Sequence, residues 1–372
     1  MTDRAVVTGV GVWTPLGTDA AATWAALTAR QTAVAPIRGF DPGAFAVRVA
    51  AVLTPPREDA LGVHPREGRI LGIPGLALLG AAREAARAAG LADAGVASER
   101  LAAFVAMGTR DPNPDDLAPA LVRAGGTGGP DLPAFYGGTY REIDPLWPLT
   151  MLNNVGFSLV ALHLGAKGEN LVLAPGADAG VAALIEAAAA VRDGRVAAAY
   201  AGGASETLTP WGLSRALRLG LVGPDGAAPG EGAGCLVLEP ADAVRRRRAR
   251  PLAAVAGWAE RTGDTEAATD ALAAALAAAG GGPVDAVLWN AAGARGREAA
   301  ARVAPGAPLV DHAPVWGHAM AGSAAVDAAL AARAIGNGDP LPGGPAGPLR
   351  RALVVGHGAG GGYAALVLTT VD

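Results

Sequence analysis

One pattern occurs twice in this sequence: a turn of small residues that leads directly into a long alanine-rich helix. The first copy, "LVLAPGADAGVAALIEAAAAVRDG" from Leu171 to Gly194, is typical of a buried strand, a tight turn and a helix. The second copy is "GHAMAGSAAVDAALAARAIGNGD", and each copy ends in a helix stop that contains glycine. Each is followed by a glycine-rich turn and an apolar strand. The sequence therefore predicts a duplicated unit, with halves at 1–245 and 246–372 and with helix starts near Ala177 and His318 that face one centre.

Between these copies, short apolar runs alternate with amphipathic helical patterns. Residues 4–12 and 101–109 are typical of strands, and residues 19–30 and 75–91 of helices. Such alternation predicts an α/β fold with a largely parallel sheet. Residues 109–145 are rich in Gly, Pro and Asp, which predicts a long functional or mobile loop.

The composition excludes several classes of protein. A net charge of -4 in 372 residues, 51% of them hydrophobic, argues against a nucleic-acid binder and allows a large core. The basic run Arg245–Arg248 indicates either a solvated helix end or a surface for an acidic partner. Cys235 is the single cysteine, so no disulfide framework is expected. With no signal-peptide pattern and no apolar run of membrane-spanning length, we expect no membrane association and a cytoplasmic location.

Two motifs invite a ligand interpretation that the sequence does not support. Gly356, Gly358 and Gly361 have the spacing of a dinucleotide-binding loop, but an apolar strand follows them where that site needs a helix. His312 and His318 lie six residues apart around a proline, a spacing unsuited to one helix face. We therefore expect neither a metal nor a cofactor.

Several blocks, taken in order, carry a family resemblance. "AVVTGVGVWTPLG" near the start, "YAGGASE", "GEGAGCLVLE" and "WGHAMAGSAA" resemble the β-ketoacyl synthases, the condensing enzymes of fatty-acid and polyketide synthesis. The resemblance covers nearly the whole chain. It implies the duplicated thiolase fold, with five layers in the order αβαβα and two pseudo-symmetric halves.

The resemblance also implies which positions carry the family's chemistry. Ala177 stands where the family has its nucleophilic cysteine, Ala292 replaces the first histidine, and Ala313 replaces a lysine. His318 retains the second histidine, and Ala359 falls where a gating phenylalanine is usual. The backbone of Ala177 and Ala359 corresponds to the oxyanion-binding N–H groups. An alanine cannot form a thioester, so the sequence predicts a chain without condensing activity of its own, although its status as an enzyme stays open.

Type II polyketide synthases offer a parallel, because an active synthase subunit pairs there with a nucleophile-free partner, the chain length factor. This sequence is similar to such a subunit, although alanine at 177 departs from the glutamine that is common there. The resemblance implies a heterodimer with an active ketosynthase, paired along residues 168–174, and contact with an acyl carrier protein. It also implies a substrate tunnel, for which the candidate lining residues are Met151, Phe157, Trp316 and Ala359.

The alternative is a repurposed acyltransferase, cyclase or decarboxylase that uses His318 or Asp178 on carrier-bound acyl substrates. His318 is interpreted as a general acid or base, or as a structural cap of a helix N-terminus. Asp178, at a helix start, is interpreted as a cap or as a new nucleophile or base. The tryptophans Trp147, Trp211 and Trp316 line a pocket or pack in the core.

Overall fold

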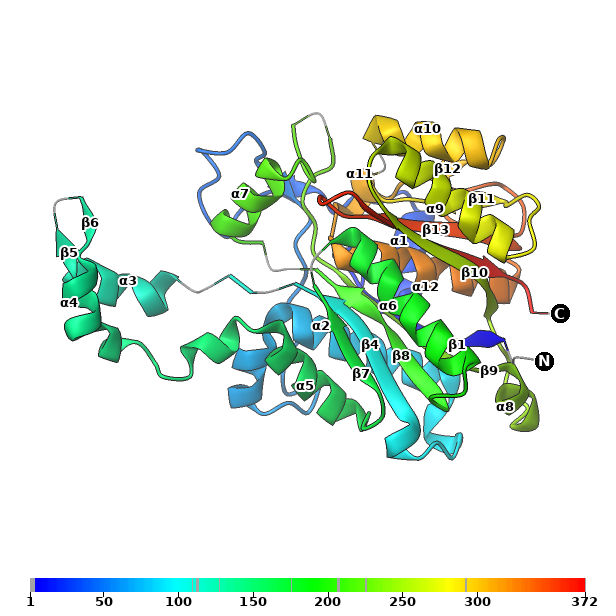
Figure 1. Cartoon of the computed structure of the whole chain (residues 1–372), viewed down its shortest axis with the longest axis horizontal. Coiled ribbons are helices and arrows are strands. Elements are labelled where there is room, and N and C mark those ends of the chain that lie inside the picture. The colour runs from blue at the N-terminus through cyan, green and yellow to red at the C-terminus, as the bar shows by residue number, and fades with distance from the viewer. Residues whose placement is uncertain are drawn as a thin grey trace.

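The structure, a computed structural model, is dominated by one ten-stranded mixed sheet between layers of helices (Figure 1). It describes residues 4–108, 110–111, 114–126, 128–174, 176–205, 208–224, 226–291 and 293–371. The strands are β1 (Ala5–Trp13), β2 (Ala35–Pro36), β3 (Val49–Ala50), β4 (Leu101–Met107), β5 (Gly125–Gly126), β6 (Gly129–Pro130), β7 (Asn170–Leu173), β8 (Ala198–Ala204), β9 (Ala233–Pro240), β10 (Ala253–Thr262), β11 (Ala286–Leu288), β12 (Leu309–Val310), β13 (Arg351–His357) and β14 (Gly362–Thr369). The α-helices are α1 (Ala20–Thr28), α2 (Pro65–Ala89), α3 (Pro114–Arg123), α4 (Leu132–Gly137), α5 (Asn153–Leu164), α6 (Ala177–Arg192), α7 (Pro210–Arg218), α8 (Ala241–Arg246), α9 (Thr265–Ala278), α10 (Gly293–Val303), α11 (Ala313–Trp316) and α12 (Ala321–Asn337).

The sheet itself shows the duplication. Its order is β12-β11-β13-β14-β10-β1-β9-β8-β4-β7. Read outward from the centre, each half has two antiparallel steps followed by two parallel ones. A short antiparallel pairing of β1 with β10 joins the halves. The chain passes from one half to the other through α8, and the division at residue 245 stays a prediction.

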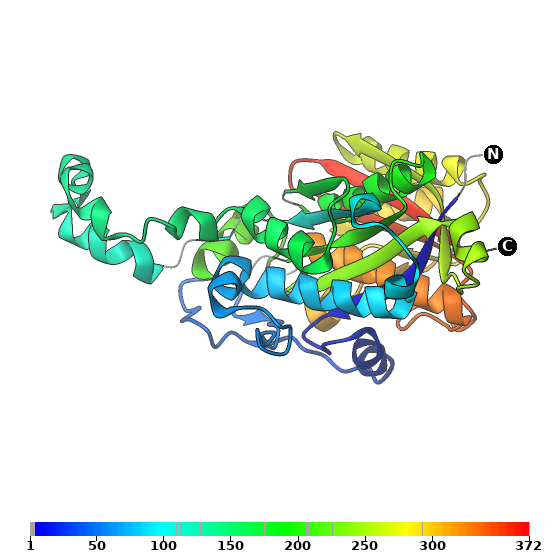
Figure 2. The ribbon, with the colours of Figure 1, turned by 90° about the horizontal axis from the view of Figure 1, so that it is seen from below.

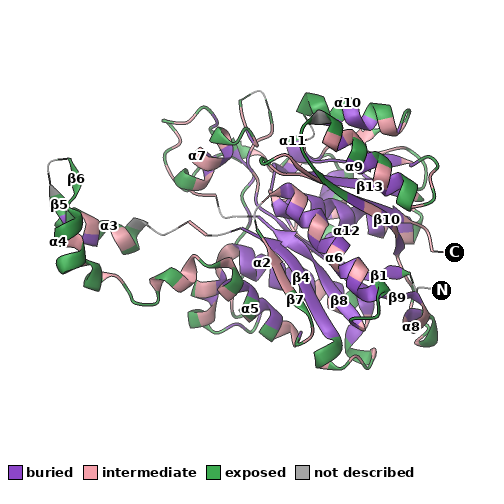
Figure 3. Cartoon of the chain, in the orientation of Figure 1, coloured by how far each residue is buried: buried purple, intermediate pink, exposed green. Residues whose placement is uncertain are grey.

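The layers follow from where apolar residues lie. Helices α6 and α12 occupy the middle, between the two halves of the sheet, and their residues form the largest buried cluster (Figure 3). Helices α2 and α5 cover the outer face of the N-terminal half, and α9 and α10 cover that of the C-terminal half. The five layers of the thiolase fold are therefore present, as expected.

Small residues let the two central helices approach closely. A Cβ atom on Gly180 of α6 would lie 2.3 Å from the carbonyl oxygen of Ala321, the first residue of α12. On its other side α12 lies against the chain just before β9, because a Cβ on Gly322 would lie 2.3 Å from the carbonyl oxygen of Gly232. These contacts leave no space for a methyl group. The small residues of the repeated pattern thus bring the two helix starts side by side.

The prediction of a long loop over 109–145 is wrong. The segment contains α3, α4, the β5–β6 hairpin and the 3-10 turn Thr139–Glu142, and it projects as an arm from the body (Figure 2). Helix α3 has Asp115 and Asp116 in its first turn, where carboxylates are favoured, and Arg123 in its last. Gly and Pro content concealed this short amphipathic helix.

The basic run at the end of α8 is only partly a solvated surface. Arg246 forms an exposed ion pair with Asp242, whereas Arg247 reaches inward to the carboxylate of Glu239, at 2.6 Å and 3.1 Å. The side chain of Glu239 is 2% exposed, and Thr8 Oγ1 donates a further hydrogen bond to it. Arg247 therefore neutralises a buried carboxylate of the N-terminal half. In the described part of the chain, no helix is both long and apolar enough to cross a membrane.

Candidate functional site

The first turn of α6 holds the position where the family resemblance places a nucleophile. Ala177 is the first helical residue and is 3% exposed, so its methyl group is buried. Gly356, at the end of β13, presses so close that a Cβ there would lie 2.3 Å from the carbonyl oxygen of Ala177. The close contact with Gly356 thus fixes the start of α6, and the side chain at position 177 is a methyl group that cannot act as a nucleophile.

An apolar pocket of about 250 Å³ opens beside this helix start. Its inner wall comes from the starts of α6 and α12 and from the turn between β13 and β14. Its outer wall comes from α7 and the residues after it. The lining residues are Gly108, Gly176, Ala204, Gly212, Arg215, Ala216, Leu219, Leu221, Met320, Ala321, Ala359 and Gly360. Of the predicted tunnel residues, Ala359 lies in this wall.

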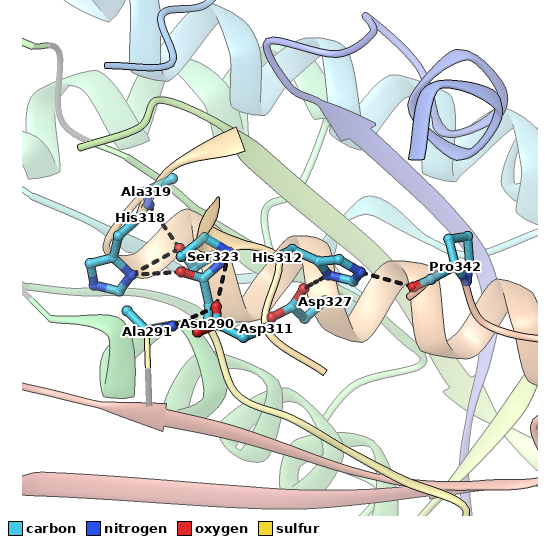
Figure 4. A network of polar contacts seen from close by, with 10 residues as sticks. Asn290, Ala291, Asp311, His312, His318, Ala319, Ser323, Asp327 and Pro342 are labelled. Carbon is cyan, nitrogen blue, oxygen red and sulfur yellow. Dashed lines mark hydrogen bonds and ion pairs between the residues drawn. The ribbon is translucent and has the colours of Figure 1, made fainter. Parts of the chain in front are cut away.

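His318 is 1% exposed and lies in a polar network drawn in Figure 4. Its side chain is held through Nδ1, which lies 2.9 Å from Asn290 Oδ1 and 3.4 Å from Ser323 Oγ. Burial, together with the neighbouring His357, lowers the pKa of His318 to about 3, so the ring is neutral. Helix α12 begins without any side-chain cap, so the interpretation of His318 as a helix cap is wrong.

Asp178 lies in the first turn of α6, under the turn between β13 and β14. The N-cap position of α6 is Gly176, which makes no side-chain cap hydrogen bond. Burial raises the pKa of Asp178, while nearby backbone N–H groups and the ring of His357 act in the opposite direction. Its Oδ1 is buried without a hydrogen-bond partner. The carboxyl group is therefore not the N-cap.

A second buried pair lies on the other side of the network. His312 Nδ1 is 2.8 Å from Asp327 Oδ1, and His312 Nε2 is 3.1 Å from the carbonyl oxygen of Pro342. Both side chains are almost fully buried. The pair ties the loop before α11 to the middle of α12 (Figure 4). Ala313, the position of the family's lysine, is buried at the start of α11.

The remaining predicted residues are spread over the molecule. Phe157 packs inside α5 against α2, and Trp316 is fully buried in the central core. Neither lines the pocket beside Ala177. Met151 ends a 3-10 turn, and its carbonyl accepts a hydrogen bond from the N–H of Arg110. Ala292 lies outside the described residues.

The tryptophans divide between the two interpretations. Trp316 is a core residue, whereas Trp211 is 48% exposed on α7. Trp147 lines an apolar cavity of about 740 Å³ in the projecting arm, beside Phe135 and Tyr140.

Two interpretations that excluded chemistry agree with the structure. Cys235 is fully buried in β9, and burial raises its pKa to about 12, which confirms it as a core residue and not a nucleophile. The glycine motif that begins at Gly356 leads into β14, a strand, as the sequence predicts. No group of three or more potential metal ligands occurs among the described residues.

Sequence reasoning missed several polar residues around the site. Asn290 and Ser323 hold His318, and Trp289 Nε1 donates a hydrogen bond to His357 Nδ1 at 3.0 Å. Asn290 is the one with a usable signal, because a polar residue that follows a buried strand end in an α/β fold marks the edge where sites form. His357 was recognised only as part of a glycine turn.

With this geometry established, comparisons identify the family. Residues 2–243 match the model of the β-ketoacyl synthase N-terminal domain, so the chain belongs to the β-ketoacyl synthase family. The tetracenomycin polyketide synthase ketoacyl synthase beta subunit of Streptomyces glaucescens is 29% identical, over 98% of this chain and 97% of that protein. The alpha subunit of the same synthase is also 29% identical, over 70% of this chain and 63% of that protein.

Solved structures show the same fold. The ishigamide ketosynthase/chain length factor superposes with a TM-score of 0.83 at 24% identity, with complete coverage of both chains. A β-ketoacyl synthase from Burkholderia phymatum gives the same TM-score at 20% identity, again with complete coverage of both.

Proposed function

We propose that this chain is a non-condensing subunit of a β-ketoacyl synthase, which acts as a chain length factor in polyketide or specialised fatty-acid synthesis. The observation that carries the proposal is Ala177. The helix start, the close glycine contact and the adjoining pocket are all kept, and the thiol is missing. A subunit of this kind needs the fold to complete a dimer, and it leaves thioester chemistry to its partner.

The pattern of similarity supports the same role. The beta subunit of the tetracenomycin synthase matches almost end to end, whereas the match to the alpha subunit covers about two thirds of each chain. A related solved structure contains a type II polyketide synthase acyl carrier protein in complex with its ketosynthase. We propose that this chain, too, works with a ketosynthase partner and an acyl carrier protein.

Strand β7 is the proposed contact with that partner. It forms one edge of the ten-stranded sheet and pairs with β4 on one side only. An edge strand can extend its hydrogen bonding to a strand of another chain, and a two-fold arrangement places two such edges together. Its apolar Leu171, Val172 and Leu173 are partly exposed.

The single lysine provides a test of this contact. Lys167 lies exposed three residues before β7. The chain is co-expressed with a cysteine-bearing ketosynthase from the same source, and the complex is treated with an amine-acylating reagent. We expect a stable heterodimer in which Lys167 is protected relative to the isolated chain. A chain that forms only homodimers and no complex contradicts the proposal.

One observation favours a second candidate function. His318 Nε2 and Asp178 Oδ1 are both buried without hydrogen-bond partners, as polar atoms kept for a substrate are. A repurposed acyltransferase, cyclase or decarboxylase could use them on a carrier-bound acyl group. Turnover by the isolated chain that is lost in His318→Ala supports this candidate over the first.

A further inference from the structure

Two imidazole rings lie side by side next to the start of α6. The rings of His318 and His357 have centroids 6.4 Å apart and planes 24° from parallel. His318 precedes α12, whereas His357 is the last residue of β13. The middle layer and the C-terminal half of the sheet therefore each contribute one histidine to the same place.

The hydrogen bonds around His357 define its tautomer. The indole N–H of Trp289 can only donate, so His357 Nδ1 must accept and carries no proton. Burial lowers the pKa of His357, although Asp178 and Asp311 oppose this shift, so the ring is neutral near pH 7. A neutral imidazole without a proton on Nδ1 carries it on Nε2. His357 thus offers an N–H donor on the side of the ring away from Trp289.

His318 has the complementary tautomer. Its Nδ1 donates to the carbonyl oxygen of the Asn290 side chain, so its Nε2 has a lone pair and no proton. That Nε2 is buried and has no hydrogen-bond partner, and the same is true of Asn290 Nδ2. An unsatisfied buried polar atom costs about 1–3 kcal/mol, so a fold keeps one mainly where a ligand or water satisfies it.

The pocket beside Ala177 is lined by the segments that follow each of these histidines in the chain. Its inner wall includes Ala321, three residues after His318, and Ala359, two residues after His357. The apolar lining suits the methylene groups of an acyl chain.

We propose that His357 and His318 together bind a β-oxygenated acyl thioester, with His357 as a substrate-binding residue that the family resemblance did not indicate. The carbonyl oxygen of the acyl group accepts a hydrogen bond from His357 Nε2–H. The β-hydroxyl group, as an alcohol or an enol, donates to His318 Nε2. No bond is made or broken in this step, and the inference rests on the proposed function only in that the chain handles acyl thioesters.

Binding of two small thioesters to the isolated chain tests the proposal. The probes are the N-acetylcysteamine thioesters of 3-hydroxybutyrate and butyrate, which differ by the one hydroxyl group. We expect the 3-hydroxybutyryl probe to bind about tenfold more tightly, since one hydrogen bond to a buried acceptor is worth about 1.4 kcal/mol. In ¹⁵N-histidine NMR spectra, the ring signals of His318 should shift with this probe and not with the butyryl probe. The ring signals of His357, which binds the thioester carbonyl, should shift with both.

Three variants separate binding from folding. His357→Phe should weaken the binding of both probes about tenfold, because both carry the thioester carbonyl, and His357→Gln, which keeps an N–H donor, should restore part of the loss. Trp289→Phe leaves both histidines in place but frees Nδ1 of His357, so the ring can change tautomer and binding should weaken. Equal affinities for the two probes, or unchanged binding in His357→Phe, overturn the inference.

This outcome is independent of the subunit assignment. If no heterodimer forms and the hydroxylated probe still shifts both histidines, the proposed function fails and the inference stands. If the heterodimer forms and the isolated chain does not distinguish the probes, the inference fails and the proposed function stands.

Discussion

The buried pair of His312 and Asp327 predicts how the stability of this protein depends on pH. Both ring nitrogens of His312 face acceptors, the carboxylate of Asp327 and a backbone carbonyl. A neutral imidazole has only one N–H, so the pair must hold one proton more than a neutral ring and an ionised carboxylate have. Hydrogen bonding and charge from Asp327 raise the pKa of His312 above its ordinary 6.5, against the effect of burial. Burial also raises the pKa of Asp327 above its ordinary 3.8. Both directions mean that the folded pair keeps its proton more firmly than the unfolded chain does.

The sign follows from where the proton is bound. Toward 6.5 the unfolded chain also holds one proton, on the histidine, so the loss of that proton from the histidine adds to the slope only above 6.5. Above 6.5 the unfolded histidine loses its proton while the folded pair retains it. Stability therefore falls as pH rises through this window, by about 1.4 kcal/mol per pH unit for one proton, until the folded pair deprotonates.

The matched variant is Asp327→Asn, because an amide can donate to His312 Nδ1 without an added proton. Urea unfolding, followed by tryptophan fluorescence between about pH 6 and pH 9, gives the free energy of unfolding of both proteins. We expect the difference between wild type and variant to change by about 1.4 kcal/mol per pH unit at the lower end of this range. Asp59→Asn, at an exposed carboxylate, is the control and should leave the slope unchanged. Parallel curves for wild type and Asp327→Asn refute the shared proton.

Three further predictions concern the packing and the missing thiol. Gly180→Ala should lower the free energy of unfolding by about 2 kcal/mol, because its methyl group would lie 2.3 Å from a backbone carbonyl oxygen. The control is Gly39→Ala, where the added methyl group has open space, and it should change the free energy of unfolding by less than about 0.5 kcal/mol. Thermal melts check both variants. Arg247→Met should cost about 3 kcal/mol in urea unfolding, since it leaves the buried carboxylate of Glu239 unpaired. Ala177→Cys should catalyse no condensation in a carrier-protein assay, because alanines also stand at 292 and 313, where the family resemblance places a histidine and a lysine.

Much of the fold could be predicted because its signals are local and repeated. The small residues at the starts of α6 and α12 are the ones that the close contact between these helices requires, so the contact is visible in the sequence. The continuous apolar run of β14 distinguishes it from a helix. The helices of the arm were missed for a local reason too. Their Gly and Pro content outweighed the amphipathic spacing of Leu117 and Leu121.

The site was less predictable because it is assembled from distant segments. Ala177 and His318 were placed by resemblance to a family motif. Trp289, Asn290 and His357 become neighbours only when β11 and β13 pair in the sheet, and no spacing along the chain indicates this. Trp316 shows the converse, because it was a candidate for the tunnel as well as for the core, and its side chain packs into the core.

The central claim is that a partner supplies the thioester chemistry that Ala177 excludes. Intact-mass spectrometry of the heterodimer, after incubation with an acylated carrier protein, tests it most directly. We predict that the mass of the acyl group appears only on the ketosynthase subunit, and that it disappears when the nucleophilic cysteine of that subunit is replaced by alanine. An acyl adduct on the present chain, or condensation by this chain in the absence of the partner, contradicts the account.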